Sequence, residues 1–280
     1  MKILIMGGSG QLGRCLQDRI PTGWDVVAPS STTVNLGDHA GLQALFQAHA
    51  TSPFDVVVNA SAYNAVDAAE TDESGAFAVN AHGPAELARL ARAMGARFFH
   101  VSTDYVFSGK LGRPYTEDDT PDPLGVYGKS KRAGEQAVLA ANPDAIVIRT
   151  AWLYSEYGRN FVKTMLTLAR QGRALKVVND QIGTPTYAGD LADVIIGLAR
   201  RTDVEGGIYH YAGADVMSWF DLAAAALEGL PCDLTPTDSS GYPTVAPRPQ
   251  FSVLACRKLE DLGFVPKPQA VSLAYVRQSV

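Results

Sequence analysis

The chain contains few cysteines and no long apolar segment. Its three cysteines, Cys15, Cys232 and Cys256, are odd in number, far apart and without C-x-x-C spacing. This pattern argues against a disulfide framework or a zinc site, and it fits a reducing cytoplasm. The N-terminal apolar run of residues 1–6 is too short for a signal peptide or a membrane span.

The chain also lacks an excess of positive charge. It has 24 Lys and Arg against 29 Asp and Glu, which gives a net charge of −5. A mildly acidic protein has no global field to attract nucleic acid or an anionic membrane, so neither is expected as a partner. The 46% of hydrophobic residues is ordinary for a globular protein with a sizeable core.

Short apolar runs alternate with helical patterns through the first half of the chain. The runs are rich in Val, Ile and Phe without polar alternation, which predicts strands covered on both faces. These strands are predicted over residues 3–6, 24–28, 55–59, 97–102 and 145–149. Helices are predicted over residues 11–20, 39–48, 74–94 and 126–141. The order predicts an α/β fold, a Rossmann-type doubly wound parallel sheet.

The second half of the chain has a looser pattern. Helices are predicted over residues 160–171, 188–201 and 218–230. The segment Pro231–Pro249 carries five prolines and is expected to hold little regular structure. We therefore assign residues 1–150, completed by part of 176–211, to the doubly wound domain, and residues 151–280 mainly to a smaller lobe.

A glycine-rich turn follows the first predicted strand. Gly8, Gly10 and Gly13 give the spacing G-x-G-x-x-G, and Gly7 with Gly10 and Gly13 gives G-x-x-G-x-x-G. Residues without a Cβ allow a tight turn and a close approach to a pyrophosphate, and the next helix offers it free N–H groups. The position between a strand and a helix indicates a dinucleotide cofactor.

The position that usually selects NAD is not acidic in this chain. A carboxylate about 20 residues after the turn would bind the ribose 2′-hydroxyl of NAD, but residues 26–37 carry no charge. Ser30 and Ser31 could hydrogen-bond a 2′-phosphate, although no Arg or Lys stands there to neutralise it. This favours NADPH and leaves NADH open. Asn35 and Leu36 would contact the adenine.

Two segments carry residues that suit carbonyl reduction. Tyr127 and Lys131 have the spacing Y-x-x-x-K, which places both on one face of a predicted helix. A phenol has a pKa of about 10, and a neighbouring ammonium and an oxidised nicotinamide ring are expected to lower it. Reduction needs such a group, because a proton must reach oxygen as hydride reaches carbon. Thr103, at the end of a predicted strand, would polarise the carbonyl.

Longer strings of residues resemble a known family. They include Asn-Ala-Ser-Ala-Tyr-Asn-Ala-Val-Asp at 59–67, Ser-Thr-Asp-Tyr-Val-Phe at 102–107 and Asn-Asp-Gln-Ile-Gly-Thr-Pro-Thr at 179–186. With the glycine turn and the Tyr–Lys pair, the chain resembles the extended short-chain dehydrogenases/reductases, and within them the dTDP-4-dehydrorhamnose reductases. The resemblance implies reduction of dTDP-4-dehydro-β-L-rhamnose to dTDP-β-L-rhamnose by NAD(P)H, the last step towards a rhamnose donor for polysaccharides.

The resemblance also implies a role for each residue that matches the family motifs. Tyr127 would donate the proton, with Lys131 as its partner and a ribose ligand. The sugar would contact Thr103, Asp104 and Trp152. The cofactor would be lined by Gly7, Gly10, Gln11, Leu12, Gly13, Ser30, Asn35, Leu36, Ala62, Tyr63, Asn64 and Val101. Residues 1–150 would thus bind NAD(P) and the smaller lobe the substrate. We add Arg248 as a ligand of the nucleotide diphosphate, because a rigid Pro-flanked arginine suits that task.

Three positions depart from the family pattern. Ser30 and Asn35 stand where family members often carry Asp, which leaves the cofactor choice and the adenine contact open. Cys15 stands where some relatives have a Glu that helps to bind a divalent metal such as Mg²⁺ between subunits. The resemblance therefore implies a homodimer, but a metal-bridged one is not expected.

Two alternative functions share these motifs. One is another nucleotide-sugar 4-ketoreductase or an epimerase, which has the same turn, catalytic residues and fold. The other is a non-catalytic NADP-binding regulatory subunit, as in methionine adenosyltransferase. The complete set of Thr103, Tyr127 and Lys131 favours catalysis, because a purely regulatory protein has no need of it.

Overall fold

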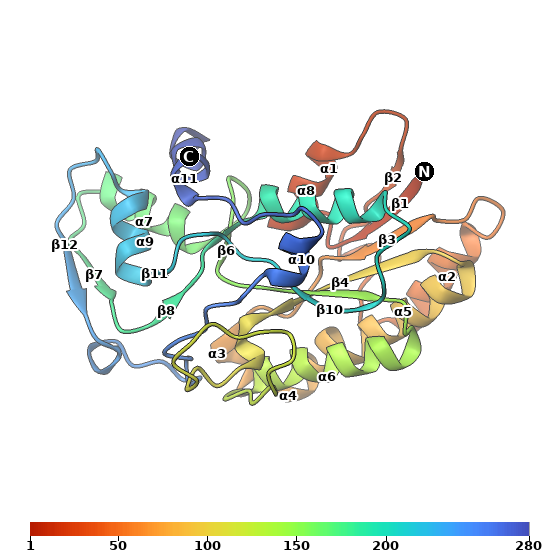
Figure 1. Ribbon diagram of the computed structural model, residues 1–280, viewed down its shortest axis with the longest axis horizontal. Coiled ribbons are helices and arrows are strands. Elements are labelled where there is room, and N and C mark those ends of the chain that lie inside the picture. The colour runs from red at the N-terminus through yellow and green to blue at the C-terminus, as the bar shows by residue number, and fades with distance from the viewer. Residues whose placement is uncertain (280) are drawn as a thin grey trace.

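The central feature of the computed structural model, which describes residues 1–279, is a six-stranded sheet (Figure 1). Its order is β10-β5-β4-β3-β1-β2, and every neighbouring pair is parallel. The strands are β1 Lys2–Met6, β2 Asp25–Val27, β3 Val56–Asn59, β4 Arg97–Thr103, β5 Ile146–Thr150 and β10 Gly207–His210. The predicted doubly wound parallel sheet is thus confirmed.

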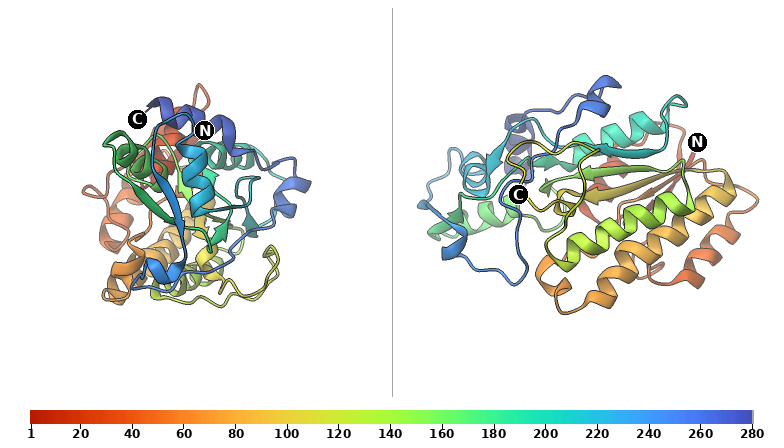
Figure 2. Two further views of the ribbon diagram at one scale, coloured as in Figure 1. Left: turned by 90° about the vertical axis from the view of Figure 1, so that its left-hand side faces the viewer. Right: turned by 60° about the horizontal axis from the view of Figure 1, so that its bottom comes forward.

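Helices cover both faces of this sheet (Figure 2). One layer contains α1 Gln11–Arg19 and α8 Ala188–Ala199, and the other contains α2 His39–Ala48, α5 Gly83–Met94 and α6 Val126–Ala141. Successive residues of a strand face opposite sides, so Ile3 and Ile5 pack with the first layer while Leu4 and Met6 pack with the second. This double coverage explains why the strand sequences are apolar throughout.

The strand order creates a switch point beside β1. The chain leaves β1 towards β2 on one side, whereas β3 lies on the other side. The carboxyl ends of β1 and β3 therefore open into a crevice, which is where ligands bind in open α/β sheets. The glycine turn follows β1, and residues 60–64 follow β3, so both lie at this crevice.

Most of the remaining chain forms a lobe beyond the carboxyl ends of the strands, on the left in Figure 1. Its apolar cluster includes Tyr154, Leu166, Leu222 and Leu273. Its elements are β6 Leu153–Tyr154, α7 Phe161–Arg170, β7 Leu175–Val178, β8 Ile182–Gly183, β9 Thr186–Tyr187, β11 Met217–Ser218, α9 Trp219–Ala226, β12 Leu234–Thr237, η3 Ser239–Gly241 and α11 Gln269–Ser279. Helix α10 Arg257–Asp261 instead packs on β10, and its Leu259 belongs to the core cluster of the sheet. Over residues 1–279, the structure contains no helix with the length and apolarity that crossing a bilayer requires.

Two expectations about the strands were wrong. Residues 24–28 were expected to form a buried strand, but Asp25 and Val26 of β2 are exposed, because β2 is the outermost strand of the sheet. Pro231–Pro249 was expected to hold little regular structure, but it contains β12, which pairs with β7. Pro236 is tolerated there because a two-stranded ribbon leaves one edge of each strand without a partner.

The helix expected over residues 74–94 is interrupted by a π-helical turn. The segment consists of α4 Glu73–Phe77, the π turn η1 Ala78–His82 and then α5. Within the turn, the Asn80 amide accepts from the Tyr63 N–H at 2.8 Å and donates to Ser130 Oγ at 3.0 Å. The turn therefore fixes the loop after β3 against α6, and such turns are frequent at functional sites.

Candidate active site

The glycine turn after β1 fits a dinucleotide pyrophosphate. Gly7 has a φ of +82°, and a Cβ on Gly13 would lie 2.2 Å from the Gly7 carbonyl oxygen, so neither position accepts a larger residue without strain. Helix α1 begins at Gln11, and Gly10 provides no side-chain cap. The N–H groups of its first turn thus remain free to bind an anion.

A cavity of about 360 Å³ opens from this turn and collects most of the predicted site residues. Those that line it are Gly10, Gln11, Leu12, Ala62, Asn64, Val101, Thr103, Asp104, Tyr127, Lys131 and Trp152. Tyr105, Arg159 and Trp219 also line it. Tyr105 belongs to the family string at 102–107, whereas no motif in the sequence indicated a role for Arg159 or Trp219. Residues from both halves of the chain therefore meet at the switch point.

The residues predicted for the adenosine end lie outside this cavity. The Ser30 hydroxyl is hydrogen-bonded to the hydroxyls of Thr32 and Thr33, at 2.7 and 2.9 Å. The Oδ1 of the Asn35 side-chain amide accepts from the Gly37 N–H at 2.9 Å. Leu36 is only 3% exposed and packs in the core, and its contact with the adenine remains a prediction. The roles of Ser30 and Asn35 remain predictions, as does that of Tyr63, whose N–H is held by Asn80.

Tyr127 stands one residue after the start of α6 and is 9% exposed. Burial raises the pKa of its phenol to about 12, with a smaller push from the Asp104 carboxylate, while Thr103 acts in the opposite direction. The expected lowering of this pKa by Lys131 and an oxidised nicotinamide ring concerns the cofactor complex and remains a prediction. The phenol is therefore protonated at neutral pH, which is the form that donates a proton.

Lys131 lies one helical turn further and is 2% exposed. Its Nζ donates to the Val101 carbonyl at 2.6 Å. Burial lowers the pKa of Lys131 to about 8, and the Glu135 carboxylate opposes that shift. Glu135 is itself paired with Arg149, whose Nε lies 2.8 Å from Glu135 Oε1. Lys131 thus lines the same cavity as Tyr127, one helical turn along α6.

The start of α6 is fixed by contacts from distant segments. Glu70, which follows the short helix α3 Val66–Ala69, accepts from the Val126 N–H at 2.8 Å through its Oε1. A Cβ on Gly128 would lie 2.2 Å from the Tyr105 carbonyl oxygen, so the helix packs directly on the 3-10 turn η2 Asp104–Val106. These contacts set the direction in which Tyr127 leaves the helix.

Thr103 and Asp104 form a buried hydrogen-bonded group beside the phenol. The Thr103 hydroxyl donates to Asp104 Oδ1 at 3.0 Å, and the Ser252 hydroxyl donates to Asp104 Oδ2 at 2.6 Å. Asp104 is 1% exposed, and burial raises the pKa of its carboxyl to about 6. Ser252, which the sequence analysis did not single out, thereby connects the C-terminal part of the chain to the end of β4.

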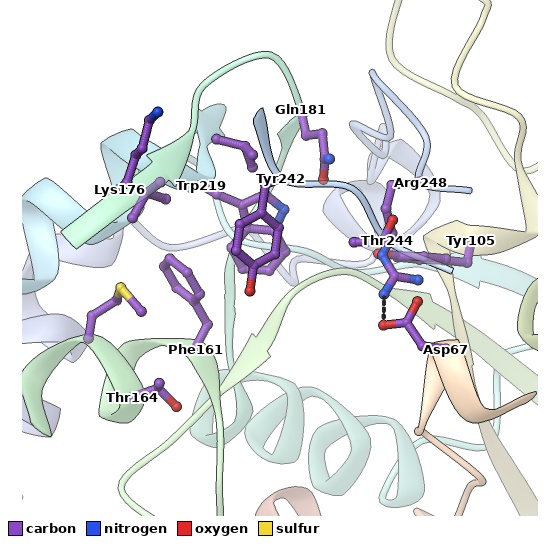
Figure 3. Close-up of a pocket in the computed structure, with 13 residues that line it drawn as sticks. Asp67, Tyr105, Phe161, Thr164, Lys176, Gln181, Trp219, Tyr242, Thr244 and Arg248 are labelled. Carbon is purple, nitrogen blue, oxygen red and sulfur yellow. Dashed lines mark hydrogen bonds and ion pairs between the residues drawn. The ribbon is translucent and has the colours of Figure 1, made fainter. Parts of the chain in front are cut away.

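Arg248 lines a second cavity, of about 450 Å³ (Figure 3), and no residue of the glycine turn is among the residues that line it. Its Nη2 pairs with Asp67 Oδ2 at 2.9 Å, whereas its buried Nη1 has no hydrogen-bond partner within residues 1–279. The rings of Phe161, Trp219 and Tyr242 line the same cavity. Trp219 also lines the first cavity, so the two adjoin.

Trp152 lies at this junction in a strained conformation. Its φ of +48° is the only positive value among the described residues other than glycine. Its ring stacks on Trp219 with centroids 3.7 Å apart, and a Cβ on Gly183 would lie 2.5 Å from it. Packing on both sides therefore holds a backbone geometry that is unfavourable by itself, as is common at binding sites.

No group of three or more His, Cys, Asp or Glu side chains within residues 1–279 is placed to hold a metal ion. Cys15 is buried, and burial raises the pKa of its thiol to about 12. A neutral buried thiol is a poor ligand, because metals bind the thiolate.

Proteins that place a tyrosine–lysine pair and a glycine turn at the switch point of a parallel sheet are short-chain dehydrogenases/reductases, which are NAD(P)-dependent oxidoreductases. The chain belongs to one family among them, the RmlD substrate binding domain family, which matches residues 1–279.

Relatives of known name support this assignment. A dTDP-4-dehydrorhamnose reductase of Mycobacterium tuberculosis is 42% identical over 95% of this chain and 88% of its own length. A probable dTDP-4,6-dihydroxy-2-methyloxan-3-one 4-ketoreductase of Streptomyces antibioticus is also 42% identical, over 95% and 90%. The crystal structure of a Bacillus anthracis dTDP-4-dehydrorhamnose reductase in complex with NADP superposes with a TM-score of 0.91, at 31% identity over 99% and 97%.

Proposed function

We propose that this protein reduces the 4-keto group of dTDP-4-dehydro-β-L-rhamnose to dTDP-β-L-rhamnose, with NADPH as the reductant. The observation that carries the proposal is the meeting of Tyr127, Lys131 and the glycine turn in one cavity. The dTDP-4-dehydrorhamnose reductases among the relatives supply the identity of the substrate.

The residues of the cavity divide the chemistry between them. When NADPH is bound, it supplies hydride to the carbonyl carbon. The protonated Tyr127 phenol delivers a proton to the carbonyl oxygen, and the Lys131 cation stabilises the phenolate that remains. Thr103 helps to hold the oxygen once its hydroxyl has turned from Asp104 to the substrate.

The second cavity suits the nucleotide part of the substrate. Aromatic rings stack well on a base, and three rings line this cavity. Arg248 lies beside Asp67 and Tyr105 (Figure 3), and Tyr105 also lines the cavity of the catalytic residues. Its buried Nη1 has no partner within residues 1–279 and belongs to a cation, which suits a diphosphate, because an unpartnered buried donor is unfavourable until a ligand arrives.

The first expected outcome concerns Arg248. Arg248→Gln should raise the KM for the nucleotide sugar about tenfold or more, because a charge-assisted hydrogen bond to phosphate contributes about 1.5–3 kcal/mol. The Kd for NADPH should stay unchanged. Steady-state kinetics and a cofactor titration measure both constants. An unchanged KM would remove Arg248 from the substrate site.

The second expected outcome is a pH profile. Lys131 carries its charge below its pKa of about 8 and loses it above, so kcat/KM should fall about tenfold per pH unit above pH 8. Tyr127, with a pKa near 12, stays protonated over this range. Initial rates between pH 6 and pH 10 test this, and a flat profile to pH 10 would show that the Lys131 charge is not needed.

Incubation with equimolar NADPH and dTDP-4-dehydrorhamnose tests the proposed function. Loss of nicotinamide absorbance with formation of dTDP-rhamnose supports it. An epimerase would retain its cofactor and cause no net loss, and a regulatory subunit would bind NADPH without turnover. The Streptomyces antibioticus relative acts on a different 4-keto sugar by its name, so dTDP-linked ketosugars of that kind are the competing substrates to compare.

Three further expectations from the sequence remain predictions. They are a homodimer, a cytoplasmic location and a preference for NADPH over NADH. The NADP complex of the Bacillus anthracis relative supports the last of them.

A further inference from the structure

A loop from the second half of the chain lies over the start of α1. Gln11 Oε1 accepts from the Ser155 hydroxyl at 3.1 Å and from the Asn160 amide at 2.8 Å. A Cβ built on Gly158, which has a φ of +60°, would lie 3.3 Å from Gln11 Cγ. Residues 155–160 therefore rest on the turn that the cofactor pyrophosphate approaches.

Arg159 is the residue of this loop that stands between Gly158 and Asn160. Its side chain is exposed and lines the first cavity together with Gly10, Gln11 and Leu12. Its guanidinium forms no hydrogen bond or ion pair within residues 1–279. The hydrogen bonds to Gln11 hold the backbone of this loop over the cavity. Because Arg159 has no protein partner, its guanidinium is available to a ligand.

The charge balance of the cavity favours an anion at this place. Among the described residues that line it, the only other cation is Lys131, whose Nζ is engaged by the Val101 carbonyl. The glycine turn contributes N–H groups and the partial charge of a helix end, about half an elementary charge. A pyrophosphate carries two negative charges, so the turn alone leaves most of that charge unbalanced.

We propose that Arg159 binds the pyrophosphate of the dinucleotide cofactor together with the N–H groups at the start of α1. The inference rests on the proposed function only in taking NAD(P) as the cofactor. A guanidinium presents two parallel N–H donors, which match two phosphate oxygens. Through Arg159 the loop between β6 and α7, which belongs to the substrate lobe, takes part in cofactor binding.

Direct titration of the cofactor tests this proposal without any sugar nucleotide. Calorimetry should show that Arg159→Gln raises the Kd of both NADPH and NADH about tenfold, by the same factor, because both carry the pyrophosphate. Arg159→Lys should be intermediate, since it keeps the charge but not the fork of donors. Arg173→Gln is the matched control, because Arg173 is an exposed arginine beyond the other end of α7.

Three results would overturn the assignment. An unchanged Kd in Arg159→Gln would exclude contact with the cofactor. A loss confined to NADPH would place Arg159 on the 2′-phosphate instead. An unchanged Kd with a raised KM for the nucleotide sugar would place it on the substrate. Because the titration needs no turnover, a protein that proved inactive on dTDP-4-dehydrorhamnose would still test the role of Arg159.

Discussion

Replacing Tyr127 by Phe should lower kcat by ~10²–10⁴-fold while the Kd of NADPH stays within about twofold. The substitution removes one oxygen from a ring that is 9% exposed and that meets Tyr105 edge-on, with centroids 5.6 Å apart. The ring and its packing remain, so the fold should be retained. What disappears is the proton donor, and a carbonyl oxygen that receives hydride without a proton must form an unstabilised alkoxide.

The matched control is Tyr209→Phe. The Tyr209 hydroxyl, on the edge strand β10, donates to the Glu205 carbonyl at 2.8 Å, and Tyr209 lines neither cavity, so its loss should change kcat less than twofold. Stopped-flow measurement of NADPH oxidation compares the variants under single turnover, where product release does not contribute. Full activity of Tyr127→Phe would remove the phenol from the mechanism and leave proton transfer to another group.

Most of the fold could be predicted because its signal is local. A strand covered on both faces is apolar throughout, and an amphipathic helix repeats every three to four residues, so the order of β1 to β5 followed from the sequence. The exposure of β2 and the pairing of β12 with β7 could not be predicted. Both depend on which strands lie beside them, and no residue within either strand encodes that.

The site residues likewise divide into those that local motifs indicated and those that only the fold brings to the site. The glycine turn and the Tyr127–Lys131 pair are short motifs, and the structure brings both to one cavity. Three other site residues come from segments that reach the site only through the packing of the second lobe. They are Arg159, Trp219 and Ser252, and no spacing of residues in the sequence indicated their roles. The role of Asn80 could not be predicted for another reason, because a π turn has no distinct residue pattern.

The pKa of Tyr127 shows an effect that the sequence could not predict. The spacing to Lys131 indicated a charge that, together with an oxidised nicotinamide ring, would lower this pKa, and that expectation for the cofactor complex remains a prediction. In the protein by itself, burial raises the pKa to about 12, and burial is a property of the whole fold. A raised pKa favours reduction, because the phenol keeps its proton until a carbonyl oxygen acquires negative charge.

The second large effect is expected for Gly10→Val. Gly10 has φ −77° and ψ 175°, which any residue adopts, and a Cβ there would meet only the Gly7 carbonyl oxygen, at 3.3 Å. The chain should therefore fold with a change in the free energy of unfolding within about 1 kcal/mol. The added methyl groups would enter the cavity where the pyrophosphate must approach, so the Kd of NADPH should rise at least ~100-fold, equivalent to about 2.7 kcal/mol.

A comparison with Gly13→Ala separates the ligand's requirement for glycine from the fold's. A Cβ on Gly13 would lie 2.2 Å from the Gly7 carbonyl oxygen and 2.6 Å from the Gly8 Cα, so the turn and α1 must move apart. Gly13→Ala should therefore lower the Tm as well as the cofactor affinity, whereas Gly10→Val should lower only the affinity. Thermal unfolding and calorimetric titration of both variants decide this. If Gly10→Val bound NADPH as tightly as the unaltered protein, the pyrophosphate would not lie on this turn.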